Sequence, residues 1–206
     1  YMVIREAEQL LEDDVKRKYD EISKTLGEVP PFDQVMNRSI RVYLAMKKLI
    51  ADCKLDMVAF KCFPEIGDYY ATACLSQGLL NDEGFTSGCV GDLNTTLTAY
   101  VLGQFTGGPV FNPDVQQVRK EDSLVKLVAD GSAAPSLAKA LTEVKLAKRG
   151  IFGEGNADGI CVGLACRPGF VTLARLFRIR GKYFMHIAQG ETYLPSNLKE
   201  AIEECG

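Results

Sequence analysis

The chain has 206 residues, of which 47% are hydrophobic and 25% charged, which is the composition of a globular protein with one large domain or two small ones. Its net charge of −3, with the basic residues scattered, argues against a nucleic-acid partner. No run approaches the ~20 apolar residues of a membrane-spanning helix and no signal peptide is visible, so we expect a cytoplasmic protein without a membrane partner.

The first half alternates helical and short apolar patterns. Apolar stripes predict helices over residues 2–25 and 33–53, a buried strand over 56–60, and a helix over 69–80. The segment 88–114 then predicts a loop, a helix that begins near Leu93 and stops at Gly107, and a short strand at 110–111. This alternation indicates an α/β fold, a Rossmann-like parallel-sheet domain over residues 1–118.

The second half is typical of antiparallel β structure. Strand-like runs cover residues 123–129, 140–146, 159–166, 169–180 and 183–189, and glycine-rich turns separate them. They predict an antiparallel β-barrel-like domain over residues 119–206, followed at its end by a short helix after Pro195. The polar stretch near 115–122 marks the expected boundary. The glycine-rich run 153–159 predicts a hairpin loop rather than a phosphate-binding loop, because no helix pattern follows it.

Two carboxylates follow the predicted strands of the first half. Glu65 comes after the strand at 56–60, and Asp92 stands at the mouth of the helix that begins near Leu93. Both are expected at one edge of a parallel sheet, where ligands of such proteins bind. Two carboxylates there suit a hard divalent cation. The alternative is structural: Asp92 caps a helix, as Asp68 can, and Glu65 is solvated.

The histidine and cysteine content limits other chemistry. His186 is the one histidine, so a two-histidine metal site within this chain is excluded, and its apolar setting predicts a hydrogen-bonded strand residue. The seven cysteines include no CxxC pair and lie mostly in apolar runs, which indicates reduced thiols rather than a disulfide framework or a zinc site.

A collinear set of motifs resembles the L-fucose isomerase-like family of sugar isomerases. In the first half these are DMVAFKCFPE at 56–65, ACL at 73–75, LLNDEG at 79–84, CVGD at 89–92 and GGPVF at 107–111. In the second half they are APSLA at 134–138, PGFVTLAR at 168–175 and IAQGE at 187–191. The resemblance covers roughly residues 35–192, and the common order of the motifs makes it specific.

The resemblance implies a portion of a sugar (aldose–ketose) isomerase that uses Mn²⁺ or another divalent cation and an ene-diol intermediate. By match to the family's Cys-Glu-x-Asp pattern, Asp92 is a metal ligand, and Glu65 is a second ligand or the catalytic base. The implied partner is a small-molecule sugar substrate, and the implied assembly is a homo-oligomer. Because the chain begins at Tyr1 and ends at Gly206, we expect a segment of a longer protein that corresponds to the second α/β and the β domain of the family.

Two departures keep other functions open. Val90 replaces the glutamate of the Cys-Glu-x-Asp pattern, and Asp130 begins the segment where relatives often have a His-Cys-Gly run. The family's metal-binding histidine lies beyond the region of Glu191, and the chain ends soon after it. The alternatives are a sugar-binding or regulatory homologue that has lost the chemistry, and a lyase or epimerase that uses the same ene-diol.

Overall fold

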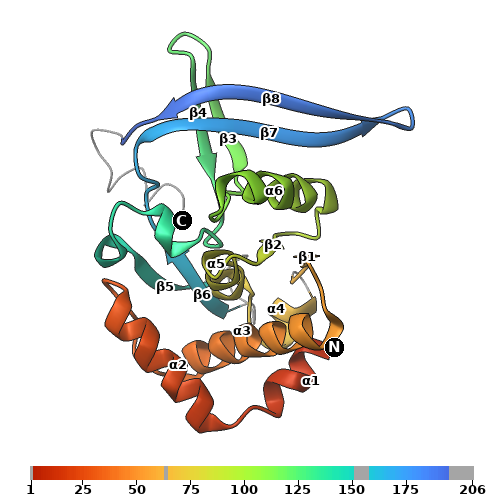
Figure 1. Cartoon of the computed structure of the whole chain (residues 1–206). Coiled ribbons are helices and arrows are strands. Elements are labelled where there is room, and N and C mark those ends of the chain that lie inside the picture. Colours follow the sequence, from red (N-terminus) through yellow and green to blue (C-terminus); the bar gives the residue numbers. More distant parts are fainter. Residues whose placement is uncertain (1, 63–64, 151–157, 195–206) are drawn as a thin grey trace.

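A computed structural model describes residues 2–62, 65–150 and 158–194 of the chain (Figure 1). The core of the glycine-rich run, residues 151–157, and the predicted C-terminal helix lie outside the described residues. The elements are α1 (Met2–Glu8), α2 (Glu12–Thr25), α3 (Gln34–Cys53), β1 (Met57–Ala59), α4 (Glu65–Tyr69), α5 (Cys74–Asp82), β2 (Thr86–Gly88), α6 (Leu93–Thr106), β3 (Asp114–Arg119), β4 (Leu124–Val128), the 3-10 turns η1 (Pro135–Leu137) and η2 (Leu141–Glu143), β5 (Lys145–Gly150), β6 (Asp158–Gly163), β7 (Gly169–Ile179) and β8 (Lys182–Thr192).

The single helix predicted over residues 2–25 is wrong, because the chain breaks into α1 and α2. Arg41 on α3 explains the break. Its Nη1 donates to the carbonyls of Ala7 and Leu10, at 3.0 and 2.8 Å, and its Nη2 pairs with Glu12 at 2.6 Å. One guanidinium thus satisfies carbonyls at the end of α1 and anchors the start of α2, so both helices pack on α3.

Helix α3 confirms the helix predicted at 33–53. Asp33 caps its start, because its carboxylate accepts the backbone N–H groups of Val35 and Met36. Lys54 ends it in a left-handed conformation with φ of 52°. Within the described part of the chain, α3 and the other helices are too short or too polar to cross a membrane.

The hydrophobic core lies between α3, α5 and the β5–β6 hairpin. Ser39 on α3 accepts the backbone N–H of Ile160 on β6 at 3.1 Å, so the hairpin is bonded to the helix as well as packed on it. One buried cluster therefore joins residues from both halves of the sequence, and its largest fully buried members are Tyr43, Met36, Ile40, Leu75, Leu80 and Ile160. The domain division proposed near residue 118 stays a prediction.

Strands β1 and β2 form the parallel pair that the buried-strand pattern predicted. Their register places Met57, Val58 and Ala59 beside Thr86, Ser87 and Gly88. The other edge of β2 is completed by a side chain, because the Asn81 amide donates to the Ser87 carbonyl at 2.9 Å and accepts its N–H at 3.0 Å. Asn81 takes the place of a third strand and ties β2 to α5.

Two local predictions of the first half are wrong. The helix expected over 69–80 is split into α4 and α5, because the Thr72 N–H leaves the helical pattern and donates to the Asp158 carbonyl of β6. The strand expected at 110–111 does not form. Val110 and Phe111 lie between Pro109 and Pro113, which cannot donate to a ladder, and the strand β3 begins only at Asp114.

The strands of the second half pair as three antiparallel hairpins, β3–β4, β5–β6 and β7–β8. The interval 115–122, expected to be a boundary, lies inside the β3–β4 hairpin. The described strands make four separate two-stranded sheets, so the described chain has mixed α/β content and no closed barrel. Strands β7 and β8 pair only with each other over eleven residues each, which leaves no described partner to close a cylinder.

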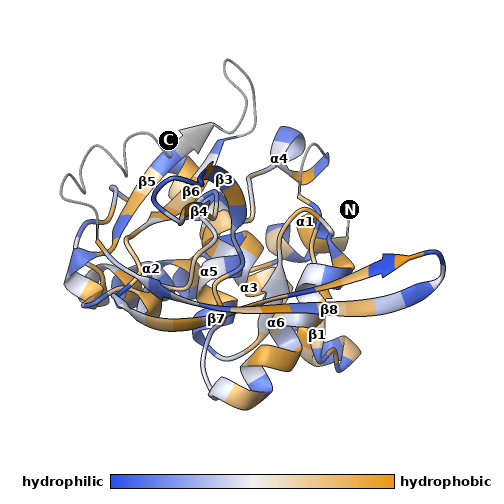
Figure 2. Cartoon of the chain, turned by 90° about the horizontal axis from the view of Figure 1, so that it is seen from above, coloured by the Kyte–Doolittle hydropathy of each residue, from blue (hydrophilic) through white to orange (hydrophobic). Residues whose placement is uncertain are grey.

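The β7–β8 hairpin crosses over α6, and its far end projects beyond the helices (Figures 1 and 2). Apolar and polar residues are interspersed along it (Figure 2), and most of its residues are exposed. It is fixed to α6 by the Thr98 hydroxyl, which accepts the backbone N–H of Leu176 at 2.9 Å. The hairpin thereby brings side chains from the end of the sequence to the start of α6.

The contact of Gly88 with α6 gives the first testable prediction. A Cβ on Gly88 would lie 1.9 Å from the Thr96 hydroxyl oxygen, and Thr96 is fully buried. Gly88→Ala should therefore lower the free energy of unfolding by about 1–3 kcal/mol. The control is Gly108→Ala, whose Cβ would meet no atom within 4 Å. Equal urea-denaturation midpoints for the two variants would contradict the close contact.

Candidate functional site

A tight turn follows β2 at residues 89–92. The Asp92 N–H donates to the Cys89 carbonyl at 3.2 Å, and the two central residues, Val90 and Gly91, have φ of 52° and 72°. Two positive φ angles are the pattern of a type I′ turn, which glycine and asparagine tolerate and a β-branched residue does not. The Gly91 N–H also donates to the Phe60 carbonyl, so the turn is fixed to the chain leaving β1.

Asp92 ends this turn and caps α6, as its position in the sequence predicted. Its Oδ1 accepts the backbone N–H of Thr95 at 2.9 Å, and its Oδ2 accepts from Nη2 of Arg175 at 2.8 Å. Partial burial opposes ionisation, but the Thr95 N–H and the Arg175 guanidinium outweigh it and hold the pKa of Asp92 below its ordinary value. Both carboxylate oxygens are thus engaged by donors.

Arg175 is a site residue that the sequence reasoning did not assign. It lies on β7, far from Asp92 in sequence, and its side chain is 49% exposed. On the neighbouring strand His186 is its direct partner in the register, so the two side chains share one face of the hairpin. His186 is a strand residue, as expected, and it is exposed. The sequence signal that could have identified Arg175 is its position as the last residue of the motif PGFVTLAR at 168–175.

Glu65 is the first residue of α4, in the segment that follows β1. Its carboxylate pairs with Lys61 at 3.1 Å, and both side chains are more than half exposed. Its own backbone N–H and the Lys61 ammonium lower the pKa of Glu65, so it is ionised at neutral pH. Lys61 in turn packs on the turn after β2, because a Cβ on Gly91 would lie 3.3 Å from the Lys61 Cβ.

The parallel pairing of β1 and β2 sends the segments that carry Glu65 and Asp92 out from the same end of the two strands, and each carboxylate is bonded to its own cation. A shared site of the two carboxylates stays a prediction. No three His, Cys, Asp or Glu side chains among the described residues gather into a group that could hold a metal ion. A divalent cation takes about six ligands. The described residues therefore do not fit such an ion by themselves, and the Mn²⁺ stays a prediction.

Several buried polar atoms lie in the elements around this edge without a hydrogen-bond partner in the described structure. They are both amide atoms of Gln77 on α5, the hydroxyl of Ser87 on β2 and the hydroxyl of Thr95 on α6. Gln77 is 1% exposed. Burial also raises the pKa of the Cys89 thiol, at the start of the turn, to about 11. Cys89 is thus a neutral thiol. Buried polar side chains lie in the elements next to the turn.

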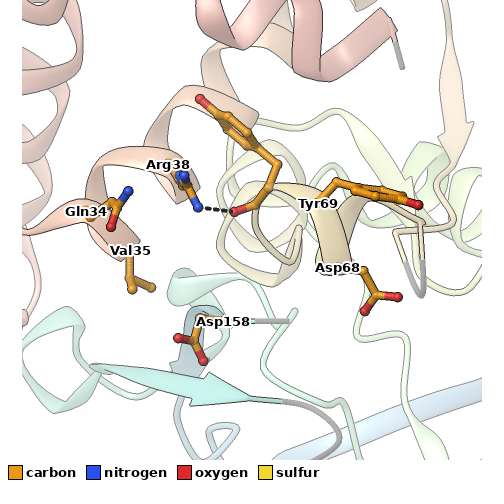
Figure 3. A pocket seen from close by; sticks show the side chains of 7 residues that line it. Gln34, Val35, Arg38, Asp68, Tyr69 and Asp158 are labelled. Carbon is orange, nitrogen blue, oxygen red and sulfur yellow. Dashed lines mark hydrogen bonds between the residues drawn. The ribbon is translucent and has the colours of Figure 1, made fainter. Parts of the chain in front are cut away.

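A separate pocket of about 340 Å³ lies between the start of α3, the end of α4 and the start of β6 (Figure 3). Neither Glu65 nor Asp92 lines it. Its cation is Arg38 (Figure 3). Arg38 donates a long hydrogen bond of 3.5 Å to the Tyr70 carbonyl, and its guanidinium lies 5.4 Å from the centre of the Tyr70 ring. The lining residues are Gln34, Val35, Arg38, Asp68, Tyr69, Tyr70 and Asp158.

The similar proteins described below share the name sulfoquinovose isomerase. No protein-family model matches the chain. It is 26% identical over 177 residues to a sulfoquinovose isomerase of Alkalicoccus urumqiensis, covering 84% of this chain and 39% of that protein. It is 27% identical over 144 residues to a sulfoquinovose isomerase of Clostridium sp. (strain MSTE9), covering 69% and 31%. A sulfoquinovose isomerase of Priestia aryabhattai is 22% identical over 160 residues, covering 77% and 35%.

The chain spans less than half the length of these curated relatives. Their shared name supports the sugar-isomerase interpretation reached from the motifs.

Two substitutions at Asp92 distinguish the contribution of its ion pair to stability from the contribution of its helix cap. Asn also caps helices, so Asp92→Asn removes mainly the ion pair, whereas Asp92→Ala removes both and should lower the free energy of unfolding by about 1–2 kcal/mol. Because the folded pKa is depressed, the charge stabilises the fold above the ordinary pKa of 3.8 and this contribution is lost as pH falls below it. The difference in unfolding free energy between wild type and Asp92→Asn, measured by urea denaturation, should therefore become smaller below this pH. A difference that grows on acidification would contradict the pairing of Asp92 with Arg175.

A substitution at the turn residue Val90 is predicted to stabilise the protein. Its side chain is exposed, so little packing is lost when it is changed, and its left-handed backbone is strained. Val90→Asn should raise the free energy of unfolding by about 1 kcal/mol, because asparagine tolerates this backbone. Val90→Ile, which keeps the β-branch, is the control and should give no increase. Thermal unfolding of the three proteins is the measurement, and a less stable Asn variant would refute the strained turn.

Proposed function

We propose that the protein carrying this chain is a sugar aldose–ketose isomerase, and that its substrate is sulfoquinovose or a similar anionic sugar. The observation that carries this proposal is the similarity to several sulfoquinovose isomerases over 69–84% of the chain. The topology supports it, since the parallel pair β1–β2 sends two carboxylate-bearing segments from one sheet edge.

The chemistry assigns Glu65 the role of general base. Its ionised carboxylate accepts the proton from the carbon that bears the hydroxyl next to the sugar carbonyl, while the electron pair forms the ene-diol double bond. The former carbonyl oxygen takes a proton from water, which completes the ene-diol. The same carboxyl then returns its proton to the former carbonyl carbon, while the hydroxyl oxygen on the first carbon loses its proton to water and becomes the new carbonyl. Lys61, which pairs with Glu65 at 3.1 Å, keeps the carboxyl ionised between turnovers. Asp92 acts as a positioning residue that holds Arg175 beside the reaction.

The architecture and the assembly belong to the same proposal. An L-fucose isomerase-like arrangement would continue β1 and β2 into a larger Rossmann-like sheet and would incorporate the β7–β8 hairpin into a barrel. The protein would act in the cytoplasm as a homo-oligomer. The Mn²⁺ implied by the resemblance would need ligands beyond the described residues, and the proton transfer by Glu65 is argued without it.

A catalytically inactive sugar-binding homologue is the second candidate function. The observation that favours it is the pairing of Asp92 with Arg175, together with Val90 at the position of the family's glutamate. Such a protein would bind the sugar without converting it. A lyase or epimerase that uses the same ene-diol would instead give a product other than the ketose.

The test is conversion of sulfoquinovose by the complete protein, with and without added Mn²⁺, followed by NMR detection of the ketose. Glu65→Gln should lower kcat by at least about 100-fold, because a general base typically contributes that much. Glu143→Gln, an exposed carboxylate on η2, is the control. Binding without conversion of any sugar in a broad panel would establish the inactive homologue, and wild-type kcat in Glu65→Gln would remove Glu65 from the mechanism.

A further inference from the structure

Arg175 is the cation that pairs with Asp92 at the start of α6. Asp92 fixes it from one side, and Asp92 is itself fixed by the Thr95 N–H, so the guanidinium is held in place before any ligand arrives. A guanidinium carries five N–H donors in a planar fork. Asp92 is its one hydrogen-bond partner among the described residues, and half of the side chain faces solvent. The remaining donors are available to a second group of acceptor oxygens.

A second nitrogen-bearing side chain stands next to it. His186 lies directly across the β7–β8 ladder from Arg175, on the same face of the hairpin, and it is exposed. The backbone bond from Leu176 to the Thr98 hydroxyl holds this part of the hairpin on α6. The fold thus brings Arg175 to the residue that caps α6 and places the chain's one histidine beside Arg175 on the hairpin.

We propose that Arg175, with His186 beside it, binds the anionic group of the sugar and determines the preference for a charged substrate. The proposal rests on the isomerase function proposed above. A sulfonate offers oxygens spaced for the two parallel N–H donors of a guanidinium, and Arg is the side chain best suited to such bidentate contacts. A phosphate presents the same oxygens, so the shared chemistry is a tetrahedral oxyanion on the sugar.

The experiment compares charged and uncharged sugars. Conversion and calorimetric binding of sulfoquinovose, glucose 6-phosphate and glucose are measured for the complete protein and for Arg175→Gln. Losing a charged hydrogen bond should raise KM and Kd for the preferred anionic sugar about 10- to 100-fold and leave the values for glucose within a few-fold. Arg175→Lys, which keeps the charge, should restore part of the preference, and His186→Gln should weaken it by a smaller factor.

The matched control is Arg178→Gln on the same strand, where the guanidinium lies over the Tyr183 ring instead. This variant should bind all three sugars like the wild type. An equal loss for anionic and neutral sugars in Arg175→Gln would overturn the proposal and leave Arg175 a structural anchor of the hairpin. Preference for glucose 6-phosphate over sulfoquinovose would identify a phosphate as the bound group. Absence of conversion with charge-selective binding would refute only the isomerase function.

Discussion

The hydrogen bonds of Asn81 to the backbone of Ser87 hold together the part of the molecule on which the candidate site depends. The parallel sheet there has only two strands of three residues, too few to be stable by themselves. The Asn81 amide satisfies the edge of β2 that none of the described strands covers, and it ties β2 to the buried helix α5. Gly88, without a side chain, lets α6 approach the same strand from Thr96. The turn that presents Asp92 is positioned by these two contacts.

Charge pairing then decides what the site can do. Glu65 and Asp92 leave the sheet at the same edge, but Lys61 and Arg175 each neutralise one of them. Two cations beside two carboxylates make this surface a poorer place for a metal ion and a better one for an anionic ligand than the carboxylates alone would suggest. The buried amide of Gln77 and the hydroxyls of Ser87 and Thr95 lie in the surrounding elements with no hydrogen-bond partner within the part of the chain that the structure describes. Unsatisfied buried polar groups destabilise a fold and are often found in functional regions.

The elements that the sequence predicted well are those set by local patterns. Asp92 caps α6, Gly107 ends α6 with a φ of 65°, and the strand-like runs in residues 169–189 become the β7–β8 hairpin. The predictions that failed depend on contacts between distant residues. Arg41 divides the first helix, the Asp158 carbonyl draws Thr72 out of the next one, and the polar stretch near 116–119 forms a strand because β4 pairs with it. No local signal in those segments reports the distant partner.

The sequence by itself determined where carboxylates follow strands, that Asp92 caps a helix, and which motifs resemble sugar isomerases, because capping, hydrophobic period and motif order are all local. It misplaced Asp68, which lies inside α4 and does not cap α5. Only the tertiary structure decided that Asp92 is bonded to Arg175, that His186 stands across the ladder from it, and that Glu65 is bonded to a different cation. The physical reason is that these contacts join residues on separate elements, more than eighty positions apart for Asp92 and Arg175. Their distance is set by how the β7–β8 hairpin packs on α6, which no local pattern encodes.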